Sequence, residues 1–203
     1  MIDDPSYHDI IERLKAQAAS ASLIADKRLS GWWHDPESYL FPTAAPELIS
    51  ATESELGFAL PPLLKAVYRE VGNGGQLLAP GLLGLPGVYD TKDGRDMVSS
   101  SKAMASFLAW WEQFVVVCDR GCSMCSCIDC TDDDFSVYRW DGNKFDEQTA
   151  VDEPSDDIWE LEANTFDEWI VEELRTFDSK LDSSVRTAAH QPYNRKRRWW
   201  QFW

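Results

Sequence analysis

Apolar residues recur with the spacing of an α-helix in several segments of the chain. The clearest segment is 61–72, where they stand at positions i, i+3, i+4 and i+7, the spacing of one buried helix face; they are Leu64, Val67, Tyr68 and Val71. Leu60-Pro61-Pro62 supplies a helix start, and Gly72 is expected to end the helix in the left-handed conformation. Asn73-Gly74-Gly75 then predicts a tight turn.

Four further segments show the helical period less strongly. They predict helices over residues 6–29, 43–57, 101–112 and from Thr165 to about Ser179. The last of these begins with Thr165-Phe166-Asp167-Glu168, a capping box in which the first and fourth side chains satisfy free backbone N–H groups. Beyond Ser179 the chain is polar, and we expect a flexible tail there.

In the middle of the chain the pattern becomes extended. Residues 114–118 are mostly β-branched, 122–129 predict a return strand after a turn at Asp119-Arg120-Gly121, and 135–140 alternate between apolar and polar. Asp141-Gly142 predicts a hairpin turn that leads into Lys144-Phe145. Consecutive antiparallel strands of this kind form a meander. Gly81–Leu85 predicts one more short buried strand, and residues 146–160 are expected to be an acidic loop.

Net charge limits what such a fold can bind. The chain has 35 acidic and 19 basic residues, which gives a formal net charge of −16. Nucleic-acid binding by the main body is disfavoured, because neutralising phosphates supplies most of the affinity of nucleic-acid-binding proteins. A strongly acidic surface keeps a protein soluble or steers a basic partner toward it.

The sequence contains no signal for a membrane or for export. No run of 18 apolar residues predicts a membrane-spanning helix, and Met1–Pro5 is acidic where a signal peptide is basic. We therefore expect a cytoplasmic protein.

Three motifs lie in the best-patterned third of the chain. They are the helix junction Leu56-Gly57-Phe58-Ala59-Leu60-Pro61, which follows Glu53, the turn Gly72-Asn73-Gly74-Gly75, and the segment Gly81-Leu82-Leu83-Gly84-Leu85. Together they resemble the SUKH superfamily, the Smi-one/Knr-four-like proteins. The resemblance covers residues 43–178 and implies an α+β fold, with helices packed on one side of a curved, mostly antiparallel sheet. It leaves an N-terminal helix and aromatic loop over 1–42 and a flexible tail over 179–203.

The same resemblance implies a protein-binding module that has no catalytic residues and no cofactor. Bacterial members are similar to immunity proteins that neutralise toxins, and fungal members are similar to regulators of cell-wall synthesis. We therefore expect an immunity protein whose partner is a toxin domain, with a basic nuclease as one candidate. A regulatory scaffold linked to cell-wall synthesis is the alternative.

Five cysteines lie within thirteen residues and allow a metal-site interpretation; they are Cys118, Cys122, Cys125, Cys127 and Cys130. A structural zinc site usually takes its two ligand pairs from separate segments, whereas the two pairs here are one residue apart. Neighbouring side chains on a strand also alternate between faces. We expect buried, reduced thiols, with a soft-metal site as the less favoured alternative. A thiol enzyme is not expected, because the three histidines, His8, His34 and His190, lie outside the motifs.

Acidic residues are concentrated in the last third of the chain. Residues 132–178 contain seventeen acidic residues and three basic ones. They form either a solvated face or a surface that attracts a basic partner. In the second case the candidate partner-binding residues are Asp132, Asp133, Asp134, Asp156 and Asp157.

The end of the chain has a different character. Arg195–Trp203 combines basic residues with four large aromatic ones. Such a segment suits contact with anionic lipid, nucleic acid or a partner groove, and equally with the acidic body of the same chain. The sequence leaves these alternatives open.

Overall fold

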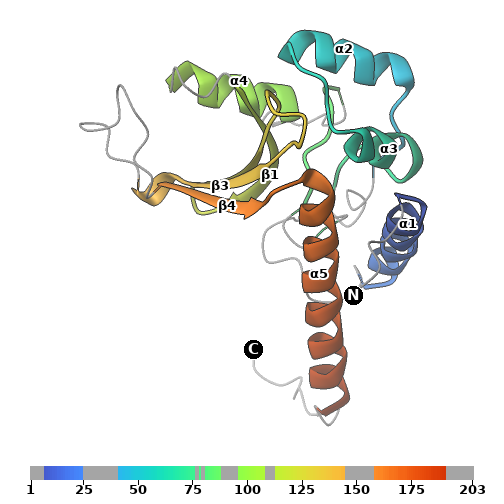
Figure 1. Ribbon diagram of the computed structural model, residues 1–203. Coiled ribbons are helices and arrows are strands. Elements are labelled where there is room, and N and C mark those ends of the chain that lie inside the picture. Colours follow the sequence, from blue (N-terminus) through green and yellow to red (C-terminus); the bar gives the residue numbers. More distant parts are fainter. Residues whose placement is uncertain are drawn as a thin grey trace, which may run out of the picture.

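The computed structural model describes residues 7–24, 41–75, 78, 81–87, 96–107, 113–144 and 158–190 (Figure 1). The helices are α1 (Tyr7–Ile24), α2 (Pro46–Leu56), α3 (Pro62–Glu70), α4 (Met97–Phe107) and α5 (Phe166–His190). The strands are β1 (Phe114–Gly121), β2 (Met124–Asp129), β3 (Val137–Asp141) and β4 (Trp159–Ala163). None of these helices combines the length and the apolarity that crossing a membrane requires.

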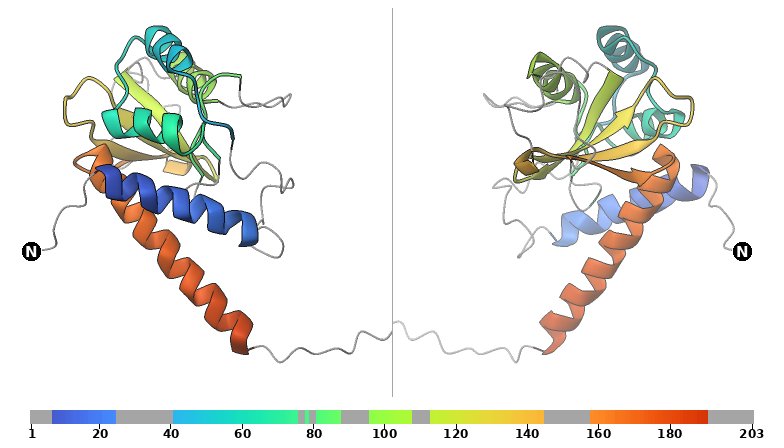
Figure 2. Two further views of the ribbon diagram at one scale, coloured as in Figure 1. Left: turned by 90° about the vertical axis from the view of Figure 1, so that its right-hand side faces the viewer. Right: turned by 60° about the vertical axis from the view of Figure 1, so that its left-hand side comes forward.

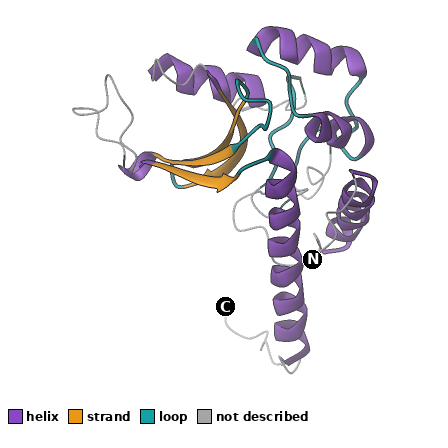
Figure 3. Cartoon of the chain, viewed as in Figure 1, coloured by secondary structure: helices purple, strands orange, loops and turns teal. Residues whose placement is uncertain are grey.

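The four strands form one open, curved sheet in the order β1-β2-β3-β4, with each pair antiparallel (Figure 3). This arrangement confirms the predicted α+β fold and the meander. Helix α4 packs on β1, and α2 packs on α4. Helices α1 and α5 each contact α3. Helix α1 also lies next to α5, where Arg13 pairs with Asp178 at 2.9 Å (Figure 2).

The turn between β1 and β2 lies at residues 122–123, after the predicted turn at 119–121. Asp119-Arg120-Gly121 belongs to β1, and the turn is made by Cys122 and Ser123, whose φ angles are 51° and 61°. Positive φ at both loop positions gives the turn a twist that matches that of the two strands. The sequence signal was misleading because Asp119, a typical turn residue, instead accepts the Gly121 N–H at 2.8 Å within the strand.

The fourth strand was not predicted. Asp141-Gly142 does not lead directly into a strand, because Gly142–Lys144 is a short 3-10 helix, and Phe145 lies outside the described residues. The strand that pairs with β3 is Trp159–Ala163, which begins in the segment expected to be an acidic loop. Its two glutamates, Glu160 and Glu162, concealed the alternation. Most of the expected acidic loop, residues 146–157, lies outside the described residues.

The junction between α2 and α3 follows the local signals of the sequence. Gly57 has a φ of 82° and its N–H donates to the Glu53 carbonyl at 2.9 Å, which ends α2 as predicted. Glu53 also accepts the Leu60 N–H at 2.9 Å and the Lys65 ammonium at 3.0 Å through its carboxylate. One side chain therefore joins the end of α2 to the start of α3.

The end of α3 differs from the prediction. The left-handed glycines are Gly74 and Gly75, with φ angles of 84° and 99°, and Gly72 is not left-handed. Gly72 instead continues the chain out of the helix, and its N–H donates to the Val67 carbonyl at 3.1 Å. Position 74 must be glycine, because a Cβ there would stand 2.5 Å from the backbone nitrogen of Gly84.

Residues 82–85 are buried and Gly81 is half-buried, but the segment forms no regular strand. Its one ladder contact is the bridge between Gly75 and Leu82. Leu83 donates its N–H to Val117 of β1 at 2.8 Å, and Leu85 donates its N–H to the side chain of Asn73 at 2.8 Å. The segment therefore ties the Asn73-Gly74-Gly75 turn to the sheet.

Helix α4 begins four residues earlier than predicted. It starts at Met97, because Asp96 accepts the Ser99 N–H at 2.8 Å and so caps the first turn. Ser101, which we expected to begin the helix, is buried inside it and accepts the Val116 N–H at 2.9 Å. The predicted end at Glu112 lies outside the described residues.

The first half of the predicted capping box of α5 is present, but its second hydrogen bond comes from the residue before Thr165. Thr165 accepts the Glu168 N–H at 3.1 Å, and the Glu168 carboxylate accepts the Asn164 N–H at 3.2 Å. The predicted end near Ser179 is wrong, because α5 continues to His190. No glycine or proline interrupts residues 179–190, so polarity alone was a poor signal for the end of the helix.

Candidate functional site

The residues of the family motif build the fold. Leu60, Pro61, Gly72, Asn73, Gly74 and Leu82 are buried; Leu56, Gly75 and Gly81 are half-buried; and Gly57 is exposed. These residues form the ends of helices and a tight turn, and they support β1. Most of them position the surface described below, and Leu56 also lines a pocket beside it.

The cysteines lie on both sides of the sheet. Cys125 and Cys127 share one face of β2, and their sulfur atoms are 3.6 Å apart. Cys118 pairs with Ser126, so a bulge at Val117 turns it to the opposite face. Among the described residues, no three His, Cys, Asp or Glu side chains converge as a metal site would require. The structure does not bring the five cysteines together.

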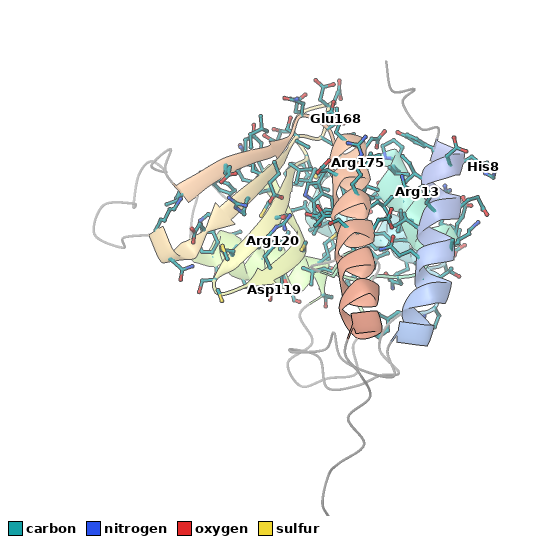
Figure 4. All side chains as sticks on the ribbon, turned by 90° about the horizontal axis from the view of Figure 1, so that it is seen from below. His8, Arg13, Asp119, Arg120, Glu168 and Arg175 are labelled. Atoms are coloured by element: carbon teal, nitrogen blue, oxygen red, sulfur yellow. The ribbon has the colours of Figure 1, made fainter. Side chains whose placement is uncertain are left out.

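Burial makes most of these thiols poor nucleophiles. It raises the pKa of Cys118 and Cys127 well above the ordinary value, and burial together with the nearby Asp129 carboxylate raises the pKa of Cys130 to about 12. Cys122 is exposed in the β1–β2 turn. His8 lies on the outer side of α1, away from the strand that carries Cys118 and Arg120 (Figure 4). His34 lies outside the described residues.

A network of charged and polar side chains, which the sequence did not predict, joins the sheet to α5. Arg120 of β1 donates to Glu173 at 2.6 Å, to Glu162 at 2.9 Å and to the hydroxyl of Ser126 at 2.7 Å. Glu162 also accepts the indole N–H of Trp169 at 2.9 Å and the Ser126 hydroxyl at 2.7 Å. We call these five residues the Arg120 network. Since its acids and its base are already paired with one another, its arrangement is that of a structural contact.

The opposite face of the sheet carries an aromatic trio, Phe114, Tyr138 and Trp159. The rings of Phe114 and Trp159 stack with centroids 4.6 Å apart, and Tyr138 meets both edge-on at 5.8 and 6.2 Å. Phe114 and Trp159 belong to the two edge strands, which would stand about 14 Å apart in a flat sheet. The sheet must therefore curve toward this face, and Figure 3 shows that the sheet is curved.

The aromatic trio is half-buried and borders an exposed leucine. All three side chains are half-buried, and Leu161, the cross-strand partner of Tyr138, is 51% exposed. Beneath them lie the buried side chains of Val116, Cys125 and Cys127. The trio thus forms an apolar surface on a rigid sheet, and large apolar side chains on such a surface are suited to contact with another molecule.

A pocket adjoins this surface on the other side of Phe114. It has a volume of about 310 Å³ and lies between α2, α4 and β1. Its lining is mainly apolar, with a glutamate and a lysine included; the residues are Glu55, Leu56, Phe58, Ser101, Lys102, Ala105, Phe114 and Val115. We call it the β1 pocket. Phe114 belongs to both the pocket and the aromatic trio, so the two features are continuous.

The predicted acidic residues Asp132, Asp133 and Asp134 are exposed in the loop between β2 and β3. This loop starts beside the beginning of β1, because Cys130 donates its N–H to Gln113 at 3.2 Å and Asp129 is the cross-strand partner of Phe114. The three aspartates therefore belong to the Phe114 end of the sheet. Asp156 and Asp157 lie outside the described residues, as does the Arg195–Trp203 segment.

Sequence reasoning missed the aromatic trio and the β1 pocket as sites. The alternation in 114–118 and 135–140 placed Phe114 and Tyr138 on strands, but β4 and its Trp159 were not predicted. The pocket combines residues 55–58, 101–105 and 114–115, whose proximity depends on how the helices pack. No local pattern encodes that packing.

Comparison with known protein families identifies the family of this chain. The model of the SMI1 / KNR4 family (SUKH-1) matches residues 43–172, which is more than half of the chain. The search of curated proteins gave no match. The matched range runs from the approach to α2 into α5 and includes the whole sheet. The chain therefore belongs to the SMI1 / KNR4 family (SUKH-1).

Proposed function

We propose that this protein is a non-catalytic binding module of the immunity type, which neutralises a cognate toxin domain by covering it. The half-buried aromatic trio on the open face of the sheet carries this proposal. Tyrosine and tryptophan held by a rigid scaffold are the residues that most often dominate the energy of a protein interface. Family membership agrees with a protein-binding role.

The net charge of the chain favours a basic partner. The overall charge of −16 attracts cationic domains over several ångströms and accelerates their association. The exposed Asp132, Asp133 and Asp134 add local negative charge at the Phe114 end of the sheet. A toxin domain that acts on nucleic acid has the complementary charge, because it must itself bind phosphates.

The remaining chemistry of the described residues supports binding over catalysis. The cysteines Cys118 and Cys127 are buried with raised pKa values, and the acids of the Arg120 network are paired with Arg120. A binding module needs neither a nucleophile nor a base. It needs a rigid surface, which the sheet and its supporting helices provide.

Co-expression with a toxin tests the proposal. The probe is the carboxy-terminal domain of a toxin encoded beside the gene of this protein, produced in a host with and without the protein. We expect growth to be restored, and restoration to be lost with Tyr138→Ala. Tyr7→Ala, which removes an exposed tyrosine on α1, is the matched control and should still protect the host.

Two results would contradict the proposal. One is that the wild-type protein fails to protect against that domain. The other is that the protein binds enzymes of cell-wall synthesis and not the toxin domain, which would favour the regulatory alternative.

A further inference from the structure

We infer that the β1 pocket is the specificity site of the proposed interface, where it receives one apolar side chain from a basic segment of the partner. This inference rests on the proposed function and adds the chemistry of the segment that is recognised. It is argued below from the lining of the pocket, its size, the charges at its edge and the neighbouring loop.

The lining of the β1 pocket selects an apolar side chain. Leu56 and Phe58 come from the α2–α3 junction, Ala105 comes from α4, and Phe114 and Val115 come from β1. Ser101 also lines the pocket, but its hydroxyl is already engaged, since it donates to the Met97 carbonyl at 2.7 Å and accepts the Val116 N–H. An inserted polar group would therefore lose hydration and gain little in return.

The size of the pocket is sufficient for one large side chain. Its volume of about 310 Å³ is at the lower end of the ~300–1,000 Å³ that is usual for small-molecule sites. The pocket is also open to solvent on one side, so an occupant can enter without any movement of α2 or α4. One large aliphatic or aromatic side chain at the centre of an interface is the usual anchor of such a contact.

An ion pair at the edge of the pocket can exchange its partner for a charged group of the bound segment. Lys102 of α4 pairs with Glu55 of α2 at 2.7 Å, and both side chains are about half exposed. An exposed ion pair contributes only about 0–1 kcal/mol, so exchanging its partners costs little. Lysine or arginine next to the inserted apolar residue can then pair with Glu55.

The β2–β3 loop explains why the rest of the partner segment is basic. A segment that leaves the pocket across Phe114 reaches the end of the sheet where this loop starts. There it meets the exposed carboxylates of Asp132, Asp133 and Asp134. A partner segment with an apolar anchor followed by cationic residues matches the apolar pocket and the acidic loop next to it. An acidic segment would be repelled.

Filling the pocket tests the inference. Ala105→Trp places a ring in the β1 pocket, and Ala103→Trp places the same ring on an exposed position of α4 that does not line the pocket. The probe is the toxin domain used above, and binding is measured by calorimetry. We expect Ala105→Trp to weaken binding at least 100-fold and Ala103→Trp to change it less than threefold.

A second pair of variants tests the charge at the edge of the pocket without changing its volume. Glu55→Lys should weaken binding about tenfold at low salt, and the effect should shrink as salt screens the charges. Glu47→Lys, at the other end of α2, makes the same charge change on an exposed residue away from the pocket and should leave binding within threefold. Thermal melting of all four variants verifies that they fold.

The outcomes separate this inference from the proposed function. If wild type binds, Tyr138→Ala does not, and Ala105→Trp binds as wild type does, the inference is wrong and the proposed function stands. If wild type itself does not bind the toxin domain, the proposed function falls and the inference falls with it. A small molecule that copurifies with wild type and is displaced by Ala105→Trp would assign the pocket to that ligand and overturn the inference.

Discussion

The two faces of the sheet differ in how their side chains are buried and paired. One face is closed by α5 through the Arg120 network, in which a charged cluster is paired internally. The other face carries the aromatic trio, whose large apolar side chains stay half-buried. The closed face holds charged side chains that are paired within the chain, whereas the other face holds large apolar side chains that are half-buried. The difference indicates where a partner gains the most free energy on binding.

The largest expected effect is the removal of the cation from the closed face. Arg120→Met leaves the buried carboxylates of Glu162 and Glu173 unpaired, and breaking such a pair typically costs about 3–5 kcal/mol of the free energy of unfolding. Arg139→Met is the matched control, because Arg139 pairs with the exposed Glu160 and should cost about 0–1 kcal/mol. Urea denaturation measures both. Equal effects would show that the Arg120 network does not fix α5.

A smaller effect on stability is expected when one tryptophan at each face of the sheet is replaced by phenylalanine. Trp169→Phe removes the indole N–H that Glu162 accepts, which should cost about 1–3 kcal/mol of stability. Trp159→Phe keeps a ring against Phe114 and should cost less than about 1 kcal/mol, while it weakens toxin binding. Thermal melts and calorimetry separate the two responses. The comparison fails if Trp159→Phe is the more destabilising change.

The buried thiols predict a loss of stability at alkaline pH. The pKa of Cys130 is about 12 in the folded protein and about 9 when the chain is unfolded, so between these values only the unfolded state loses the proton. Stability is therefore complete below pH 9 and falls as the pH rises toward 12, by at most about 1.4 kcal/mol per pH unit for this thiol. Cys130→Ser should make the fall shallower in urea titrations at several pH values. Cys122→Ser, at an exposed position, is the matched control.

The smallest effect on stability is expected at the β2–β3 loop. Replacing Asp132, Asp133 and Asp134 by asparagine should change the free energy of unfolding by less than about 0.5 kcal/mol. It should slow association with a basic partner and reduce the salt dependence of the rate. A control with the same charge change replaces three exposed acids on other elements by glutamine: Glu12, Glu70 and Glu172. Equal slowing by both sets would mean that net charge matters and the position of the loop does not.

Much of the fold could be predicted because its signals are local. Pro62 starts α3, Gly57 ends α2, and Thr165 with Glu168 caps α5, each through backbone groups only a few residues away. The left-handed bend was placed two residues early, and the need for glycine at position 74 comes from its close contact with Gly84. That contact joins segments ten residues apart and leaves no periodic signal.

The surface that we propose as the binding site was harder to predict. Strand β4 is rich in glutamate, and Glu162 is acceptable inside the protein only because Arg120, 42 residues earlier, pairs with it. Without β4 there was no reason to place Trp159 beside Phe114. The role of Asp132, Asp133 and Asp134 in binding stays a prediction, as does that of Asp156 and Asp157.

Hydrogen–deuterium exchange of the protein, alone and bound to the toxin domain, tests the open face most directly. We predict new protection in residues 130–136 and 159–161, at the loop and strand that border the aromatic trio. Helix α1 lies away from this face and should exchange as it does in the free protein. Protection confined to α1 and α5, with none at the aromatic trio, would contradict the assignment of the open face as the binding surface.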